Sequence, residues 1–130
     1  MLVPHIMSGQ TIGVLGLGSS GMAAAASLDA AGVTVFAHDD NKPAANLPNG
    51  TVMPWQDWPW SDLDALVISP GIPHLHPTPH PAAARAAAAH IEIVSEVEIG
   101  LRAAPQAPIV VITGTNGKST TTALIGHCLH

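Results

Sequence analysis

Apolar residues along the chain gather in short runs that end at glycine, proline or charged residues. Runs of this length, rich in branched side chains, predict β-strands, and the predicted strands are residues 11–15, 33–37, 51–53, 64–69 and 91–94. Alanine-rich or amphipathic stretches between them predict helices at residues 22–31, 79–90 and 95–103. Strands without polar alternation, separated by helices or long connections, are typical of a parallel sheet with helices on both faces. We therefore expect an α/β fold.

The C-terminal part of the chain repeats the order strand, glycine turn, helix. Residues 109–113 are a strongly apolar predicted strand, residues 114–117 form a predicted tight turn, and a helix is expected from Ser119 onward. Pro105 and Pro108 bracket residues 104–108, which we interpret as a linker. The predicted organisation is a disordered leader at residues 1–10, an α/β domain at 11–103, the linker, and the truncated start of a second domain at 109–130.

Composition limits the classes of function. The 130 residues are 47% hydrophobic, which is enough for one ordinary core. Only 10% of the residues are charged, and the four cations are scattered singly, so nucleic acid is not an expected partner. Because the formal net charge is −5, the electrostatic field of the whole protein would not attract an anionic ligand. Such a ligand would have to be held by groups in direct contact with it.

The single cysteine, Cys128, cannot form a disulfide within the chain, and no cleavable leader pattern opens the sequence. The apolar runs are broken well before the roughly 20 residues that a membrane-spanning helix needs. We therefore expect a cytoplasmic protein without a membrane segment.

Gly16, Gly18 and Gly21 have the spacing G-x-G-x-x-G between a predicted strand and a predicted helix. In this context the spacing is typical of a Rossmann-like nucleotide site, because the glycines permit a tight turn, close approach of a phosphate and close packing of the helix. No cation precedes Lys42, so a phosphate would be held by backbone amides and the positive end of the helix dipole. The alternative is a purely structural strand-to-helix turn.

Asp39 follows the second predicted strand, 21 positions after Gly18. An acidic residue at this place commonly accepts hydrogen bonds from the ribose or base of a nucleotide. Asp40 beside it would repel a 2′-phosphate, which disfavours NADP. The alternative for the pair is a solvated loop, which applies more readily to Asp40.

A second glycine loop gives the strongest signal in the chain. It comprises Gly114, Thr115, Asn116, Gly117, Lys118, Ser119 and Thr120, and its Gly-Lys-Ser ending after a buried strand indicates a phosphate-binding loop. Backbone amides would wrap the phosphates of a nucleotide, Lys118 would reach the β- and γ-phosphates, and the Ser119 hydroxyl would hold Mg²⁺. The loop is two residues shorter than the pattern G-x-x-x-x-G-K-[ST], since its first glycine is Gly114.

The two phosphate-binding units together resemble the Mur ligase family, whose ATP loop has this shortened form, and the resemblance covers nearly all of the chain. Residues 16–21, residues 67–72 (Val-Ile-Ser-Pro-Gly-Ile) and residues 92–98 (Glu-Ile-Val-Ser-Glu-Val-Glu) are most similar to the D-glutamate-adding branch of that family. The L-alanine-adding branch, which is the alternative within the family, typically has His where Asn116 stands.

The resemblance implies an ATP- and Mg²⁺-dependent acid–amino-acid ligase of peptidoglycan precursor synthesis, which adds D-glutamate to UDP-N-acetylmuramoyl-L-alanine through an acyl phosphate. Residues 114–120 would hold ATP, with Lys118 and Ser119 as catalytic residues and Ser119 on the metal. The UDP moiety would be held by Gly18, Ser19, Ser20, Gly21, Asp39, Asp40, Ser69, Pro70 and Gly71. Asp40 and Asn41 depart from the Thr and Arg often found there, so contacts at the uracil end would differ.

Family members have three domains, so the resemblance also implies that most of the machinery lies outside these 130 residues. We expect the 130-residue chain to bind uridine nucleotides weakly and to turn over nothing, and we expect the full-length protein to be a monomer. Two other classes stay open from the residues alone. An NAD-dependent oxidoreductase would explain the first loop and Asp39 but not Lys118 and Ser119, whereas a non-catalytic nucleotide-sensing module would fit both loops.

Other residue clusters are interpreted structurally. His74, His76 and His80 lie in a proline-rich loop with a spacing that suits no closed metal site, so we expect solvated side chains. Trp55, Trp58 and Trp60 are expected to fix an irregular connection onto the core.

Overall fold

The computed structural model describes residues 7–42, 46–104 and 106–129. Its centre is a five-stranded parallel sheet in the order β3-β2-β1-β4-β5. The strands are β1 (Thr11–Leu15), β2 (Thr34–His38), β3 (Thr51–Val52), β4 (Ala65–Ile68) and β5 (Glu92–Ser95). Each of these strands begins and ends within one residue of its predicted bounds, and the predicted parallel α/β sheet is confirmed.

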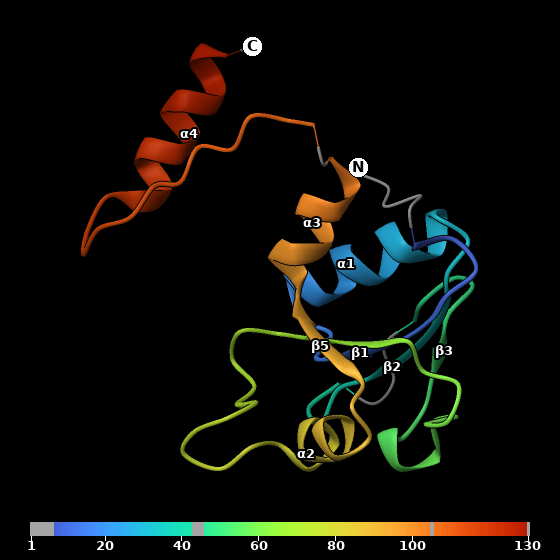
Figure 1. Cartoon of the computed structure of the whole chain (residues 1–130). Helices are drawn as coiled ribbons and strands as arrows, with labels where there is room; N and C mark the ends of the chain where they lie inside the picture. The colour runs from blue at the N-terminus through green and yellow to red at the C-terminus, as the bar shows by residue number, and fades with distance from the viewer. Residues whose placement is uncertain (1–6, 43–45, 105, 130) are drawn as a thin grey trace.

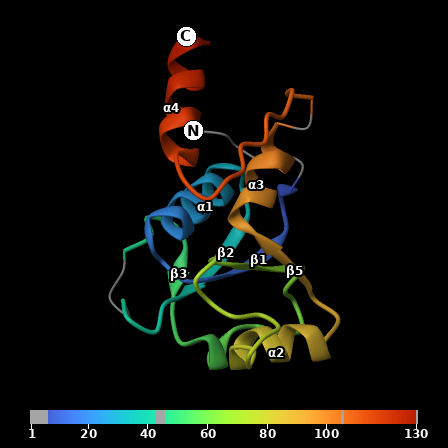
Figure 2. The ribbon, with the colours of Figure 1, turned by 90° about the vertical axis from the view of Figure 1, so that its left-hand side faces the viewer.

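Helices cover both faces of the sheet (Figures 1 and 2). α1 (Ser19–Ala30) and α3 (Glu96–Ala103) pack on one face, and α2 (Pro81–Ala88) lies on the other with the 3-10 turn η2 (Trp55–Asp57). From β1 the chain moves outward to β2 and β3, and it then returns to β4 on the other side of β1. This is a Rossmann-like arrangement, whose strand order changes direction between β1 and β4.

The central strands bury both of their faces. In β1, Ile12 and Val14 pack in the core cluster beneath α1 and α3, whereas Leu15 packs in the cluster beneath α2. In β4, Val67 and Leu66 divide between the two clusters in the same way. Burial on both sides explains why these strands read as continuous apolar runs.

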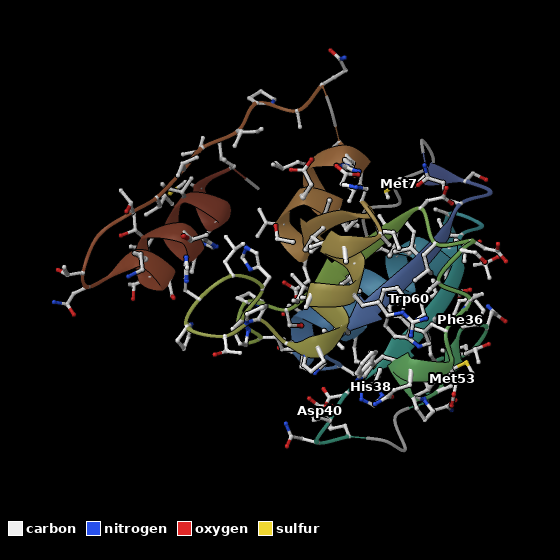
Figure 3. All side chains as sticks on the ribbon, turned by 60° about the horizontal axis from the view of Figure 1, so that its bottom comes forward. Met7, Phe36, His38, Asp40, Met53 and Trp60 are labelled. Atoms are coloured by element: carbon white, nitrogen blue, oxygen red, sulfur yellow. The ribbon has the colours of Figure 1, made fainter. Side chains whose placement is uncertain are left out.

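A tryptophan-rich connection between β3 and β4 completes the core cluster beneath α2. Trp58 and Trp60 are buried, and their indole N–H groups donate to the carbonyl oxygens of Met53 and Trp55. The Trp58 ring lies over Gly13 of β1, where a Cβ would stand 2.5 Å from Trp58 Cζ3. The prediction that the tryptophans fix this connection onto the core is confirmed, and Met53 and Trp60 can be followed in Figure 3.

The structure differs from the predicted leader at residues 7–10. Met7 is 2% exposed and packs in the cluster beneath α1 and α3, and the Gly9 N–H donates to the carbonyl oxygen of Gly32 at 3.1 Å. One buried side chain and one turn are enough to order so short a segment, and neither produces a periodic pattern in the sequence. Residues 1–6 of the predicted leader lie outside the described residues.

Beyond α3 the chain runs away from the sheet to α4 (Lys118–Cys128), which stands apart in Figure 1. The predicted helix is present and begins one residue early, but the strand predicted at residues 109–113 is wrong for this structure. Ile109, Val110 and Val111 are 63%, 67% and 82% exposed, and they pair with none of the described strands. An apolar run forms a strand only where a neighbour satisfies its N–H and C=O groups.

The helices are short, and α1, with 12 residues, is the longest of those described. No helix in the described ranges combines the length and the apolar character that a membrane crossing requires.

A substitution at Gly21 tests how closely α1 packs on the sheet. A Cβ at position 21 would overlap the carbonyl oxygen of Gly16, a backbone atom that cannot rotate aside. We expect Gly21→Ala to lower the free energy of unfolding by about 1–3 kcal/mol, the usual cost of overpacking. Urea denaturation followed by circular dichroism measures this change.

Gly100→Ala is the matched control, because Gly100 lies within α3 and a Cβ there would meet nothing within 4 Å. Helix propensity should make this second variant more stable by about 0.5–1 kcal/mol. Equal effects of the two substitutions would contradict the packing role assigned to Gly21.

Candidate functional site

A cavity of about 460 Å³ opens at the carboxyl edge of the sheet. Its walls come from the segments that follow β1, β2 and β4, and they comprise Gly16, Gly18, Ser19, Ser20, Asp39, Asp40, Asn41, Ser69, Pro70, Gly71 and Ile72. In open parallel sheets, ligands bind at this place because the loops diverge where the strand order reverses. The structure brings eight of the nine residues predicted for the UDP moiety into one cavity. The ninth, Gly21, lies behind the wall, against Gly16.

The first glycine loop turns the chain from β1 into the cavity wall. Gly16 has φ +96°, which favours glycine, and its N–H donates to the carbonyl oxygen of His38 at 2.8 Å. α1 then begins at Ser19, with Gly18 as N-cap and without a capping side chain. The first N–H groups of a helix lack partners within the helix and carry the positive end of its dipole. The loop therefore offers hydrogen-bond donors to the cavity, although none of the lining residues is cationic.

The carboxylate of Asp39 holds the glycine loop from the end of β2. Its Oδ2 accepts from the Leu17 N–H at 2.6 Å, and its Oδ1 accepts from the Asn41 N–H at 2.8 Å. Burial raises the pKa of Asp39, but the amides of Leu17, Asn41 and Lys42, together with the charge of Lys42, outweigh burial and hold the pKa below its ordinary value. Asp39 is therefore an anion at neutral pH, and its oxygens keep lone pairs that can accept from a ligand.

Asp40 is held between two histidines. Its Oδ1 lies 3.0 Å from His38 Nε2 and its Oδ2 lies 3.1 Å from His80 Nε2. The hydrogen bond with His38 is the main cause of a lowered pKa of Asp40; burial opposes this effect, and His80 adds to it. His38 and Asp40 lie at the end of the domain opposite Met7 (Figure 3). The side chain of Asp40 thus already has two partners at the rim of the cavity.

His80 has a structural role that its loop position conceals. It is the N-cap of α2, and its Nδ1 accepts from the Ala82 N–H at 3.1 Å, which leaves Nε2 to carry the proton that faces Asp40. The prediction of a solvated side chain is wrong for His80, which is 12% exposed, because the ring acts as a capping acceptor. His74 and His76 are exposed, as predicted.

Glu96, the first residue of α3, reaches the cavity wall from behind. Its Oε1 accepts from Ser20 Oγ at 3.0 Å and from Ser69 Oγ at 2.7 Å. Ser69 Oγ also lies 3.3 Å from the carbonyl oxygen of Gly16. No local motif marks Glu96 as a site residue, since its two partners lie 76 and 27 positions away in the sequence.

The second glycine loop lies outside this cavity. Gly117, with φ +76°, is the N-cap of α4, and Lys118 Nζ donates to the carbonyl oxygen of Gly114 at 2.6 Å. The loop and the first turn of α4 are exposed, including Ser119. Their amides, ammonium group and hydroxyl are a donor set that fits nucleotide phosphates and Mg²⁺. The predicted UDP and ATP residues therefore form two separate groups.

Within the described ranges, no three or more His, Cys, Asp or Glu side chains come together as a set able to hold a metal ion. The His38, Asp40 and His80 side chains bond to one another instead.

Comparison with known proteins links the chain to one set of enzymes. The chain is 45% identical, over 129 residues, to the UDP-N-acetylmuramoylalanine–D-glutamate ligase of Rhodopseudomonas palustris (strain HaA2), an alignment that covers 94% of this chain and 28% of that protein. It is 45% identical over 132 residues to the ligase of the same name from Paramagnetospirillum magneticum, covering 99% of this chain and 29% of that protein. A third, from Caulobacter sp. (strain K31), is 43% identical over 128 residues, covering 92% and 27%.

No family model matches the chain. The chain spans less than a third of the length of the curated relatives that it matches. The resemblance indicated by the motifs is confirmed, because over nearly its whole length this chain is homologous to a part of the UDP-N-acetylmuramoylalanine–D-glutamate ligases of the Mur ligase family.

Proposed function

We propose that the cavity at the carboxyl edge of the sheet binds the UDP moiety of UDP-N-acetylmuramoyl-L-alanine, in a ligase that adds D-glutamate to it. The main support for the proposal is the composition of the cavity. The amides at the start of α1, the Asp39 carboxylate and the segment after β4 line one space at the point where the strand order reverses. The relatives' name, which combines UDP-N-acetylmuramoylalanine with D-glutamate, supports the choice of ligand.

The two ends of the cavity suit different parts of UDP. Asp39 accepts hydrogen bonds, so it suits the N–H of uracil or the ribose hydroxyls. The amides at Ser19 and Ser20 donate, so they suit the phosphates, and Gly71 leaves room for the nucleoside beside them. The ring therefore lies toward β2 and the diphosphate lies across the start of α1.

The second glycine loop is assigned to ATP. Lys118, which donates to the Gly114 carbonyl oxygen, would donate to the β- and γ-phosphates instead, and Ser119 would hold Mg²⁺. ATP with Mg²⁺ would supply the γ-phosphoryl group that converts the alanine carboxylate into an acyl phosphate, with release of ADP. The amine of D-glutamate would then attack the acyl carbon, displace inorganic phosphate and lose a proton. The contribution of this loop is to orient the phosphates and to neutralise charge on the transferred group.

Saturation-transfer NMR with UDP, NADH and ATP tests the assignment. We expect saturation of the uracil and ribose protons of UDP and of the adenosine protons of ATP, and no mutual displacement of these two nucleotides because their sites are separate. NADH should give no transfer that UDP can displace. Displacement of UDP by NADH would instead favour a dinucleotide site and an oxidoreductase.

Asp39→Ala should weaken UDP binding about 10- to 100-fold, because it removes the acceptor that holds the Leu17 amide in the loop as well as an acceptor for the ligand. Titration calorimetry or the NMR titration measures the change. Asp57→Ala is the matched control, since Asp57 is an exposed carboxylate of η2 outside the cavity. Equal losses in the two variants would show a general effect of charge rather than a role of Asp39.

Lys118→Ala should weaken ATP binding about tenfold or more while UDP binding stays unchanged, because Lys118 lies outside the cavity at the sheet. Arg85→Ala, which removes an exposed cation of α2, should change neither affinity. If Lys118→Ala weakened UDP binding, the two glycine loops would have to serve one nucleotide.

A further inference from the structure

Glu96 differs from the other carboxylates at the cavity in its electrostatic surroundings. Asp39 lies near Lys42, and Asp40 is bonded to His38 and His80. Across the described parts of the chain, the ion pairs are His38 and His80 with Asp40, and Arg102 with Glu92 and Glu98; none includes Glu96. Its negative charge is therefore balanced only by hydroxyl groups and by the start of its own helix, α3.

The hydroxyl groups of Ser20 and Ser69 already point to Glu96. Each serine has a single hydroxyl proton. The Ser20 proton is directed to Glu96 Oε1, whereas Ser69 Oγ lies in donating range of both Glu96 Oε1, at 2.7 Å, and the carbonyl oxygen of Gly16, at 3.3 Å. A phosphate oxygen can only accept hydrogen bonds, so it gains nothing from Ser20 Oγ while the Ser20 proton bonds Glu96. The ligand phosphates must either use the backbone amides alone or break this bond.

A phosphate at these serines would also lie close to the carboxylate. A phosphate oxygen in hydrogen-bond contact with Ser20 Oγ or Ser69 Oγ would lie within about 6 Å of Glu96 Oε1. At this distance two negative charges repel each other. A terminal phosphate carries about −1.5 to −2 at neutral pH, whereas a phosphate esterified on both sides carries about −1.

We propose that Glu96 is a specificity-determining residue of the cavity, which favours a diphosphate esterified at both ends over one that ends in a free phosphate. The inference rests on the proposed function, since it requires a uridine diphosphate in the cavity. The carboxylate leaves the backbone amides as the donors for the ligand and penalises additional charge. The substrate class selected in this way is the nucleoside diphosphate sugar.

Binding of uridine, UDP and UDP-N-acetylglucosamine to the wild type and to Glu96→Gln tests the proposal. Glutamine keeps an acceptor oxygen for Ser20 and Ser69 and removes the charge. We expect Glu96→Gln to bind UDP roughly three- to tenfold more tightly, the effect of one unit charge at about 6 Å in surroundings screened almost as strongly as bulk water. UDP-N-acetylglucosamine should gain less than UDP, and uridine should not change. Titration calorimetry at one pH and ionic strength measures all three affinities.

Glu98→Gln is the matched control, because it removes the same charge from the first turn of the same helix, where Glu98 pairs with Arg102 rather than with the cavity serines. Its ratio of UDP to UDP-N-acetylglucosamine affinity should equal that of the wild type. The proposal is overturned if Glu96→Gln leaves this ratio unchanged or alters all three affinities equally. A wild-type chain that binds none of the three ligands would overturn the proposed function itself.

Discussion

The hydrogen bond from the Leu17 amide to Asp39 fixes the place where a nucleotide could lie. The side chain of Leu17 is buried in the core cluster beneath α1 and α3, and Asp39 directly follows β2. The bond therefore joins that core cluster to the end of a neighbouring strand. The parallel bond from the Gly16 amide to His38 gives the loop a second attachment to the same strand. With the loop held at two points, the first turn of α1 has a defined direction, and its free amides converge on the cavity. Without these ties the glycine residues would leave the turn free to adopt many conformations.

Under the proposed function, the cavity would recognise its anionic ligand through the direction of backbone N–H groups rather than through net positive charge. Amide dipoles act only at hydrogen-bond distance, whereas a cluster of lysines would attract any polyanion from farther away. The surrounding carboxylates would add to this selectivity, because they would repel charge that the amides do not contact. Two of them also stabilise the fold, since Asp39 holds the loop and Asp40 joins the end of β2 to the start of α2 through His38 and His80.

Local signals in the sequence were sufficient for the sheet and for most of the cavity wall. Strand length, glycine spacing and the acidic residue after β2 are properties of adjacent residues, and the loops that carry them meet because the ends of parallel strands share one edge. Contacts between distant segments could not be predicted. Glu96 contacts Ser20 only because α3 packs against α1. His80 caps α2 through its ring nitrogen, and histidine is not among the residue types usually expected at an N-cap. The strand predicted at residues 109–113 is wrong for a related reason, since an apolar run does not reveal whether a partner strand is present.

The contact between Trp58 and Gly13 shows how the face of the sheet that carries α2 is covered although few helical residues pack on it. The chain passes from β3 to β4 through a connection in which the only regular element described is η2, so α2 would leave the middle of that face uncovered. The indole fills the space where β1 lacks a side chain, and it thereby takes the place of a second covering helix. A side chain at position 13 would therefore require a smaller residue at position 58, so the two positions constrain each other.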